Sequence, residues 1–165
     1  MKKELLNIAY IDAANLYKGI ESQDWKLDYK RFRVWLSEKH GVKAAYIFIG
    51  MMSKNKDLYA KLQEAGYTLI FKEVIYDGDG KPKGNCDADL VLAVTRDYYE
   101  NKFSKAIIVS SDGDYSSLIK FLNDKDKLAV VLSPAIEKKC SILIKRTGVP
   151  IIYLNQVKTH FSLMP

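Results

Sequence analysis

Two aspartates separated by a single glycine, Asp112 and Asp114, stand directly after the apolar run 106–110. The run has the composition of a buried strand, and apolar residues at helical spacing follow the acids, so the pair occupies a strand-to-helix turn. Neighbouring carboxylates repel each other and gain nothing from burial. A helix-capping role for Asp114 explains one acid but not two. The pair therefore indicates either a bound cation or a turn that lies open to water.

Three further acids occur where a parallel sheet would bring them to the same place. Asp12 ends the first apolar run, and Asp87 and Asp89 open the helical pattern at 86–101. Because a helix turns once in about 3.6 residues, Asp87 and Asp89 point roughly 200° apart. One of them is expected to face the other acids, while its neighbour caps the helix or faces solvent.

The ligand chemistry of these residues favours a hard cation. Carboxylate oxygens are the ligands that Mg²⁺ and Mn²⁺ prefer. Cys86 and Cys140 are far apart and form no ladder with histidine, so the sequence indicates neither a structural zinc site nor a disulfide framework. We therefore predict that the acids hold Mg²⁺ or Mn²⁺.

The elements that must position these acids alternate along the chain. Runs typical of buried strands cover 5–11, 42–49, 67–76, 106–110, 128–132 and 149–154. Helical patterns cover 28–40, 53–66, 86–101, 115–123 and 136–146, with a short helical turn near Leu16. The alternation predicts an α/β fold with a central parallel sheet of five or six strands between two helical layers. Ligands of such sheets bind beyond the carboxyl ends of the strands, so adjacency of the first and fourth strands would bring Asp12 to Asp112.

Composition sets outer bounds on the class of protein. The 165 residues suit one domain, 1–165, and no apolar run approaches the roughly 20 residues of a membrane span. The first run contains Asn7 and ends at Asp12 without a cleavage site, so it is a strand and not a signal peptide. Low cysteine content favours a reducing cytoplasm. The net charge of +6 favours a polyanionic partner, and a homo-oligomer is compatible with the sequence.

The acids lie in three segments, IDAANL at 11–16, KGNCDADL at 83–90 and VSSDGDY at 109–115. Taken together, these segments resemble the signatures of NYN domains. NYN domains form the branch of the PIN-like nuclease superfamily that includes the LabA/DUF88 proteins, and the resemblance runs from Ile8 to about Leu154. It implies a PIN-like three-layer α/β/α sandwich with sheet order 3-2-1-4-5, to which an edge strand can be added. It also implies metal-dependent endonuclease activity, usually on RNA.

The resemblance assigns roles to particular residues. It implies that Asp12, Asp87, Asp112 and Asp114 are the catalytic, metal-binding acids. The first motif has Ala13 and Ala14 where glycine is common in the family, a departure that leaves the acids intact. The supporting residues are Asn15, Asp89, Ser110 and Ser111. The Asn15 amide is expected to orient a ligand or bind a phosphate, or alternatively to cap a helix. One of the two serine hydroxyls is expected to hydrogen-bond a carboxylate.

Basic residues are needed to offset repulsion between the acids and a phosphodiester. The candidates for nucleic-acid binding are Lys81, Lys83, Arg96, Lys138, Lys139, Lys145 and Arg146. The polar loop 77–84 is expected to form a lip over the acids.

Three functions are compatible with these observations. A metal-dependent ribonuclease acting on single-stranded or flexible RNA explains all the acids, because a flexible strand can bend its phosphate into an acidic pocket more easily than a duplex. A non-catalytic RNA- or protein-binding module with a vestigial acidic pocket is the alternative. The third is another metal-dependent phosphoryl-transfer enzyme. However, a haloacid-dehalogenase-type phosphatase needs a second acid near Asp12, and a Toprim nuclease needs a glutamate after the first strand.

Overall fold

A parallel sheet forms the middle layer of the protein. The computed structural model describes residues 6–83 and 85–163. Within these residues, six strands form the sheet in the order β3-β2-β1-β6-β7-β8, and each neighbouring pair is parallel. The strands are β1 (Asn7–Asp12), β2 (Val42–Met51), β3 (Thr68–Glu73), β6 (Ala106–Val109), β7 (Leu128–Ser133) and β8 (Ile151–Tyr153).

The strand order confirms the predicted topology. Numbered by their occurrence along this sheet, the strands follow the order 3-2-1-4-5, with β8 as the additional edge strand. The first and fourth strands, β1 and β6, are neighbours, with Ile11 opposite Val109 in the register. Successive strands are therefore added toward one edge of the sheet from β1 to β3 and toward the other edge from β6 to β8. The strand order reverses between β1 and β6, which is where ligands of open parallel sheets bind.

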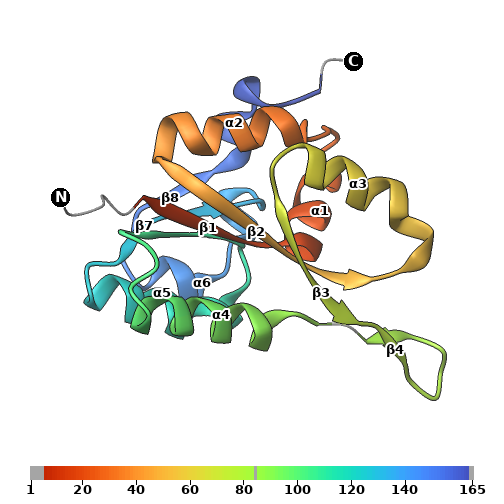
Figure 1. Cartoon of the computed structure of the whole chain (residues 1–165). Helices are drawn as coiled ribbons and strands as arrows, with labels where there is room; N and C mark the ends of the chain where they lie inside the picture. The colour runs from red at the N-terminus through yellow and green to blue at the C-terminus, as the bar shows by residue number, and fades with distance from the viewer. Residues whose placement is uncertain (1–5, 84, 164–165) are drawn as a thin grey trace.

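Helices cover both faces of the sheet, which gives three layers (Figure 1). One layer contains α1, α2 and α3, and the opposite layer contains α4, α5 and α6. Their bounds are α1 (Ala13–Glu21), α2 (Tyr29–His40), α3 (Lys56–Glu64), α4 (Asp87–Tyr99), α5 (Ser116–Asp124) and α6 (Ile142–Lys145). No helix in the described ranges is both long enough and apolar enough to cross a membrane.

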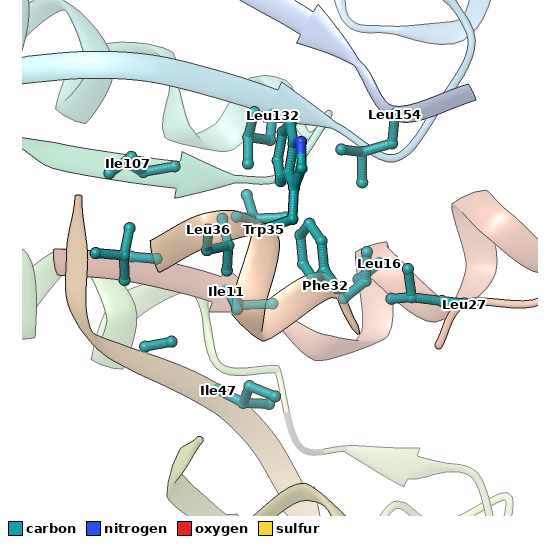
Figure 2. Packing of buried hydrophobic residues seen from close by; sticks show 14 of the residues in the cluster. Ile11, Leu16, Leu27, Phe32, Trp35, Leu36, Ile47, Ile107, Leu132 and Leu154 are labelled. Carbon is teal, nitrogen blue, oxygen red and sulfur yellow. The ribbon is translucent and has the colours of Figure 1, made fainter. Parts of the chain in front are cut away.

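The two apolar cores follow from the two-residue period of the strands. On β1, Ile11 faces the α1–α2 side and Tyr10 faces the α4–α5 side. Figure 2 shows Ile11 packed with Phe32 and Trp35 of α2, all of them buried. Because helices cover both faces, successive residues of a central strand are buried, which explains the continuous apolar runs in the sequence.

The ends of α2 show how local sequence sets an element. Asp28 caps its amino terminus, with a side-chain oxygen that accepts a hydrogen bond from the Arg31 N–H. Gly41 ends the helix in the left-handed conformation, with a φ of 64°. The predicted helix 28–40 is thus confirmed, and Trp35 lies in the core.

The predicted strand 67–76 is interrupted. Pairing with the main sheet ends at Glu73. The next strand, β4 (Ile75–Tyr76), pairs in antiparallel fashion with β5 (Pro82–Lys83) in a separate hairpin. The Asp77 carboxylate closes the hairpin by accepting hydrogen bonds from the N–H groups of Asp79 and Lys81. Residues 75–83, the hairpin arm, project beyond the β3 edge of the sheet (Figure 1), and their role as a lip over the acids stays a prediction. Leu5 and Gly84, assigned to a strand and to the loop, lie outside the described residues.

Two helical predictions differ in length from the structure. The short turn expected near Leu16 is the nine-residue helix α1. The expected helix 136–146 is divided into a 3₁₀ turn at Glu137–Lys139 and the short helix α6. The division occurs because the Ser141 N–H donates to the Ser111 carbonyl oxygen, which ties extended backbone to the loop after β6.

Candidate metal centre

Three aspartates converge at the carboxyl edge of the sheet. Asp12 is the last residue of β1, Asp112 lies three residues beyond the end of β6, and Asp87 is the first residue of α4. Each offers one carboxylate oxygen, and the three oxygens lie within 4.8 Å of one another. Parallel pairing of β1 with β6 explains the first two positions, because adjacent parallel strands end at the same edge. The start of α4 brings the third acid to that edge.

Asp12 is the most buried acid of the group, with 7% of its surface exposed. Its Oδ1 caps α1 by accepting a hydrogen bond from the Asn15 N–H at 3.2 Å. Burial raises the pKa of Asp12 above its ordinary value. The charges of Asp87 and Asp112 raise this pKa further, whereas the Asn15 hydrogen bond lowers it. The fold therefore holds a carboxylate where its charge is unfavourable without a cation.

The two acids at the start of α4 point in different directions. Asp87 faces the other acids, and its Oδ1 accepts a hydrogen bond from the Tyr115 hydroxyl at 2.8 Å. Asp89, expected as a supporting residue, forms an ion pair with Lys72 of β3 at 3.3 Å. Helical geometry had left the choice between them open, and packing of α4 beside β3 decides it.

Asp112 and Asp114 share one tight turn but have different surroundings. The Asp112 Oδ1 accepts a hydrogen bond from the Asp114 N–H at 2.9 Å and caps the 3₁₀ turn Gly113–Tyr115. Asp114 is exposed and is not one of the three acids that share the 4.8 Å cluster. Its pKa is raised, first by the charge of Asp112 and then by desolvation and Asp87. Asp114 thus lies beside the cluster on its solvent side.

The predicted supporting residues hold the backbone of the site. The Asn15 Oδ1 accepts hydrogen bonds from the backbone N–H and the hydroxyl of Ser111, at 2.9 and 3.0 Å. The structure thus excludes the helix-cap alternative for Asn15, because the cap of α1 is Asp12. The binding of a phosphate oxygen through the Asn15 amide N–H groups stays a prediction. The Ser110 hydroxyl accepts a hydrogen bond from the Asp112 N–H. Both serines therefore orient the turn and do not donate to a carboxylate in these hydrogen bonds.

The glycine of the turn makes room for α6. A Cβ atom built on Gly113 would overlap the Ser141 Oγ and lie 3.1 Å from the Leu143 Cδ1. Since real Cβ contacts are almost never that close, α6 can approach the turn only where residue 113 has no side chain. The Asp-Gly-Asp pattern thus combines two acids with a close packing contact.

Tyr115 is a site residue that the sequence did not reveal. It was interpreted as an apolar helix residue, and its side chain is indeed fully buried. However, its hydroxyl lies 2.8 Å from Asp87 Oδ1 and 3.2 Å from Asp12 Oδ2. Burial, reinforced by the charge of Asp12, raises the pKa of Tyr115 far above its ordinary value, so the hydroxyl keeps its proton. Its position directly after the second acid of the motif was the available signal.

The predicted basic residues are not all near the acids. Lys81 and Lys83 are exposed on the hairpin arm, and Lys138 and Lys139 are exposed in the turn that follows β7 at the carboxyl edge. Arg96 is in the last turn of α4, nine residues beyond Asp87, which corresponds to about 13 Å along the helix axis. Arg96 is therefore remote from the acids, and its contact with nucleic acid stays a prediction.

A polar pocket lies between α5 and α6, next to the Asp112 turn. Its volume is about 310 Å³. Lys120 and Arg146 contribute positive charge to its lining, and Ser116 and Ser117 contribute hydroxyl groups. Lys145 is half-buried in the last turn of α6, outside this lining. Lys120 was absent from the predicted set because a lone lysine on a helix has no distinguishing pattern.

The donor set fits a divalent hard cation. The clustered atoms are carboxylate oxygens from Asp12, Asp87 and Asp112, and hydrogen bonds already orient each of these side chains. Mg²⁺ and Mn²⁺ prefer oxygen ligands, and such ligands normally have supporting hydrogen bonds of this kind. The mutual repulsion that raises the pKa of Asp12 is what a cation would relieve.

An open parallel sheet of this order, with acids at the ends of β1 and β6 and at the start of α4, defines a PIN-like α/β protein. Residues 8–149 match the NYN domain, so the chain belongs to the NYN domain family, a branch of the PIN-like nuclease superfamily. The fold is also similar to the crystal structure of a protein of unknown function from Vibrio parahaemolyticus RIMD 2210633. That similarity has a TM-score of 0.78 and 21% sequence identity, and it covers 99% of each chain. Among curated proteins, none matches this chain.

Proposed function

We propose that this protein is a metal-dependent endoribonuclease that hydrolyses phosphodiester bonds of single-stranded or flexible RNA. The observation that carries the proposal is the convergence of carboxylate oxygens from Asp12, Asp87 and Asp112 within 4.8 Å on an NYN fold. The same cluster argues against a purely structural role for the acids, because each comes from a different element and burial opposes the charge of Asp12.

Asp12, Asp87 and Asp112 would hold Mg²⁺ or Mn²⁺. When bound, the ion supplies Lewis-acid chemistry that activates water and offsets charge on the phosphate. Asp114 lies on the solvent side of the cluster, a position that suits it to accept the proton of the attacking water. In the net reaction, water adds to phosphorus, one phosphorus–ribose oxygen bond breaks, and the leaving oxygen takes up a proton.

The charge distribution favours a flexible polyanion. The acids repel a phosphodiester, whereas Lys138 and Lys139 lie at the same sheet edge and Lys81 and Lys83 lie on the hairpin arm. A single strand can bend to reach the acids and the lysines together, but a stiff duplex pays a deformation energy. Beside the Asp112 turn, the pocket between α5 and α6 is lined by two basic residues, Lys120 and Arg146, and one acid, Asp124.

The test is cleavage of labelled single-stranded RNA in Mn²⁺, with a parallel sample in EDTA. The double variant Asp112→Asn, Asp114→Asn should reduce the cleavage rate about 100-fold or more, because it removes one ligand and the proton acceptor. The control is Asp57→Asn, which removes an exposed carboxylate on α3 and should cut at the unaltered rate. If the unaltered protein and the double variant bind RNA equally and neither cuts any substrate tried, the protein is a binding module.

A further inference from the structure

The hydroxyl of Tyr115 lies between two of the three clustered acids. It is 2.8 Å from Asp87 Oδ1 and 3.2 Å from Asp12 Oδ2, and the side chain has no exposed surface. Asp12 ends β1 and Asp87 begins α4, so the hydroxyl links a strand and a helix that are separated by 75 residues. The 3₁₀ turn that contains Tyr115 also carries the third acid as its cap, Asp112.

Two negative carboxylates at this separation repel each other. A tyrosine hydroxyl has one proton, so it donates to one carboxylate at a time, and the shorter distance favours Asp87. The Asp12 Oδ1 is already oriented by the Asn15 N–H, which leaves Tyr115 as the group that relates Asp87 to Asp12. Each carboxylate oxygen retains a further lone pair for a cation.

We propose that Tyr115 is a positioning residue of the metal centre, whose hydroxyl holds Asp12 and Asp87 at ligand separation before the cation arrives. This inference rests on the proposed function, because it assumes that the three acids bind Mg²⁺ or Mn²⁺. Hydrogen-bonding partners of metal ligands typically change metal affinity 10- to 100-fold when they are removed. Without the hydroxyl, the cation itself must bring the two acids together, so its binding becomes weaker.

The chain contains a matched control in Tyr10. It too is fully buried in the α4–α5 core, and its hydroxyl donates to the Asp97 carboxylate at 2.7 Å. Asp97 is ten residues beyond Asp87 on α4 and does not belong to the acid cluster. Tyr115→Phe and Tyr10→Phe each remove one oxygen atom and one buried tyrosine–aspartate hydrogen bond, but only the first change touches the metal centre.

The experiment is a calorimetric titration of the unaltered protein and both variants with Mn²⁺, which requires no RNA. We expect Tyr115→Phe to raise the Mn²⁺ dissociation constant about 10-fold or more. Tyr10→Phe should leave it within about twofold, although both variants lose thermal stability through the lost hydrogen bond. In cleavage assays, Tyr115→Phe should need correspondingly more Mn²⁺ for half-maximal rate and should recover most of its rate at saturating Mn²⁺.

The outcomes separate this inference from the proposed function. If the unaltered protein and Tyr115→Phe bind Mn²⁺ equally, the positioning role is overturned while the metal-dependent nuclease stands. Equal weakening in both tyrosine variants, or loss of folding in Tyr115→Phe alone, also overturns it, because the hydroxyl would then serve the fold. If the unaltered protein binds no Mn²⁺, both proposals fail, whereas Mn²⁺ binding without cleavage removes the nuclease alone.

Discussion

At the scale of single residues, Asp12 has two opposite effects on stability when no cation is bound. Its Oδ1 caps α1, which stabilises the fold, but its charge is buried next to Asp87 and Asp112. Asparagine caps helices as well as aspartate does and carries no charge. The metal-free protein is therefore less stable with Asp12 than it would be with asparagine, a common relation between active sites and stability.

We predict that Asp12→Asn raises the free energy of unfolding by about 0.5–2 kcal/mol at pH 7.5 in EDTA, while abolishing the stabilisation produced by Mn²⁺. Urea denaturation with and without Mn²⁺ measures both effects. Asp79→Asn, in the exposed turn of the hairpin arm, serves as the control and should change neither quantity.

The same variant gives a pH prediction. Because the folded protein raises the pKa of Asp12 above the unfolded value of about 3.9, the ionised form costs stability above the folded pKa. That cost is relieved as the pH falls through the folded pKa. The advantage of Asp12→Asn over the unaltered protein should therefore shrink when denaturation is repeated near pH 4. An advantage that grows on acidification would contradict the assigned cause.

At the scale of elements, the packing of α6 against the Asp112 turn positions the acids. Gly113 is not one of the glycines with a positive φ. Its role is therefore to leave room for α6, and not to give the backbone conformational freedom. Ser141 both caps α6 and contributes the oxygen that a side chain at 113 would meet. The site turn and α6 are thus one packing unit, although they are distant in sequence.

Gly113→Ala is predicted to cost about 1–3 kcal/mol of stability, because the added methyl group overpacks the contact with α6. Adding Ser141→Ala should recover part of that loss, even though Ser141→Ala alone removes a helix cap. A double-mutant cycle by urea denaturation measures the coupling. Gly78→Ala in the hairpin arm, where nothing lies within 4 Å, is the control. Additive losses in the cycle would show that the close approach has no energetic effect.

At the scale of the whole molecule, positive charge lies on both sides of the acids at the carboxyl edge of the sheet. The hairpin arm carries Lys81 and Lys83 at one end of the strand order, and Lys138 and Lys139 follow β7 near the other. A flexible RNA that reaches both groups would cross the acids between them. Such binding depends on salt because phosphate contacts release counterions.

The double variant Lys81→Ala, Lys83→Ala is predicted to weaken RNA binding and to lower the slope of log affinity against log salt by about 1.4, since each lost phosphate contact on a single strand contributes about 0.7. Lys102→Ala, Lys127→Ala removes the same charge before β6 and β7, at the opposite edge of the sheet, and should leave the slope unchanged. Fluorescence anisotropy with labelled RNA between about 50 and 200 mM salt measures both. Equal effects of the two variants would indicate that only net charge matters.

The layers of the fold and the edge at which the acids gather can be predicted from the sequence alone. Apolar periodicity reports which segments are buried, and acids that directly follow parallel strands must share the carboxyl edge once β1 and β6 are adjacent. The order of the strands came from the NYN resemblance, since local patterns carry no information about which strands pair.

The identities of the contacting atoms depend on long-range packing and cannot be predicted from local patterns. Such packing turned Asp87 toward the acids and Asp89 toward Lys72, engaged Asn15 with Ser111, and placed the Tyr115 hydroxyl between two carboxylates. It also divided the predicted helix 136–146. The physical reason is that propensity and periodicity act within a segment. The direction of a side chain and the end of a short helix depend instead on packing between segments that are far apart in the sequence.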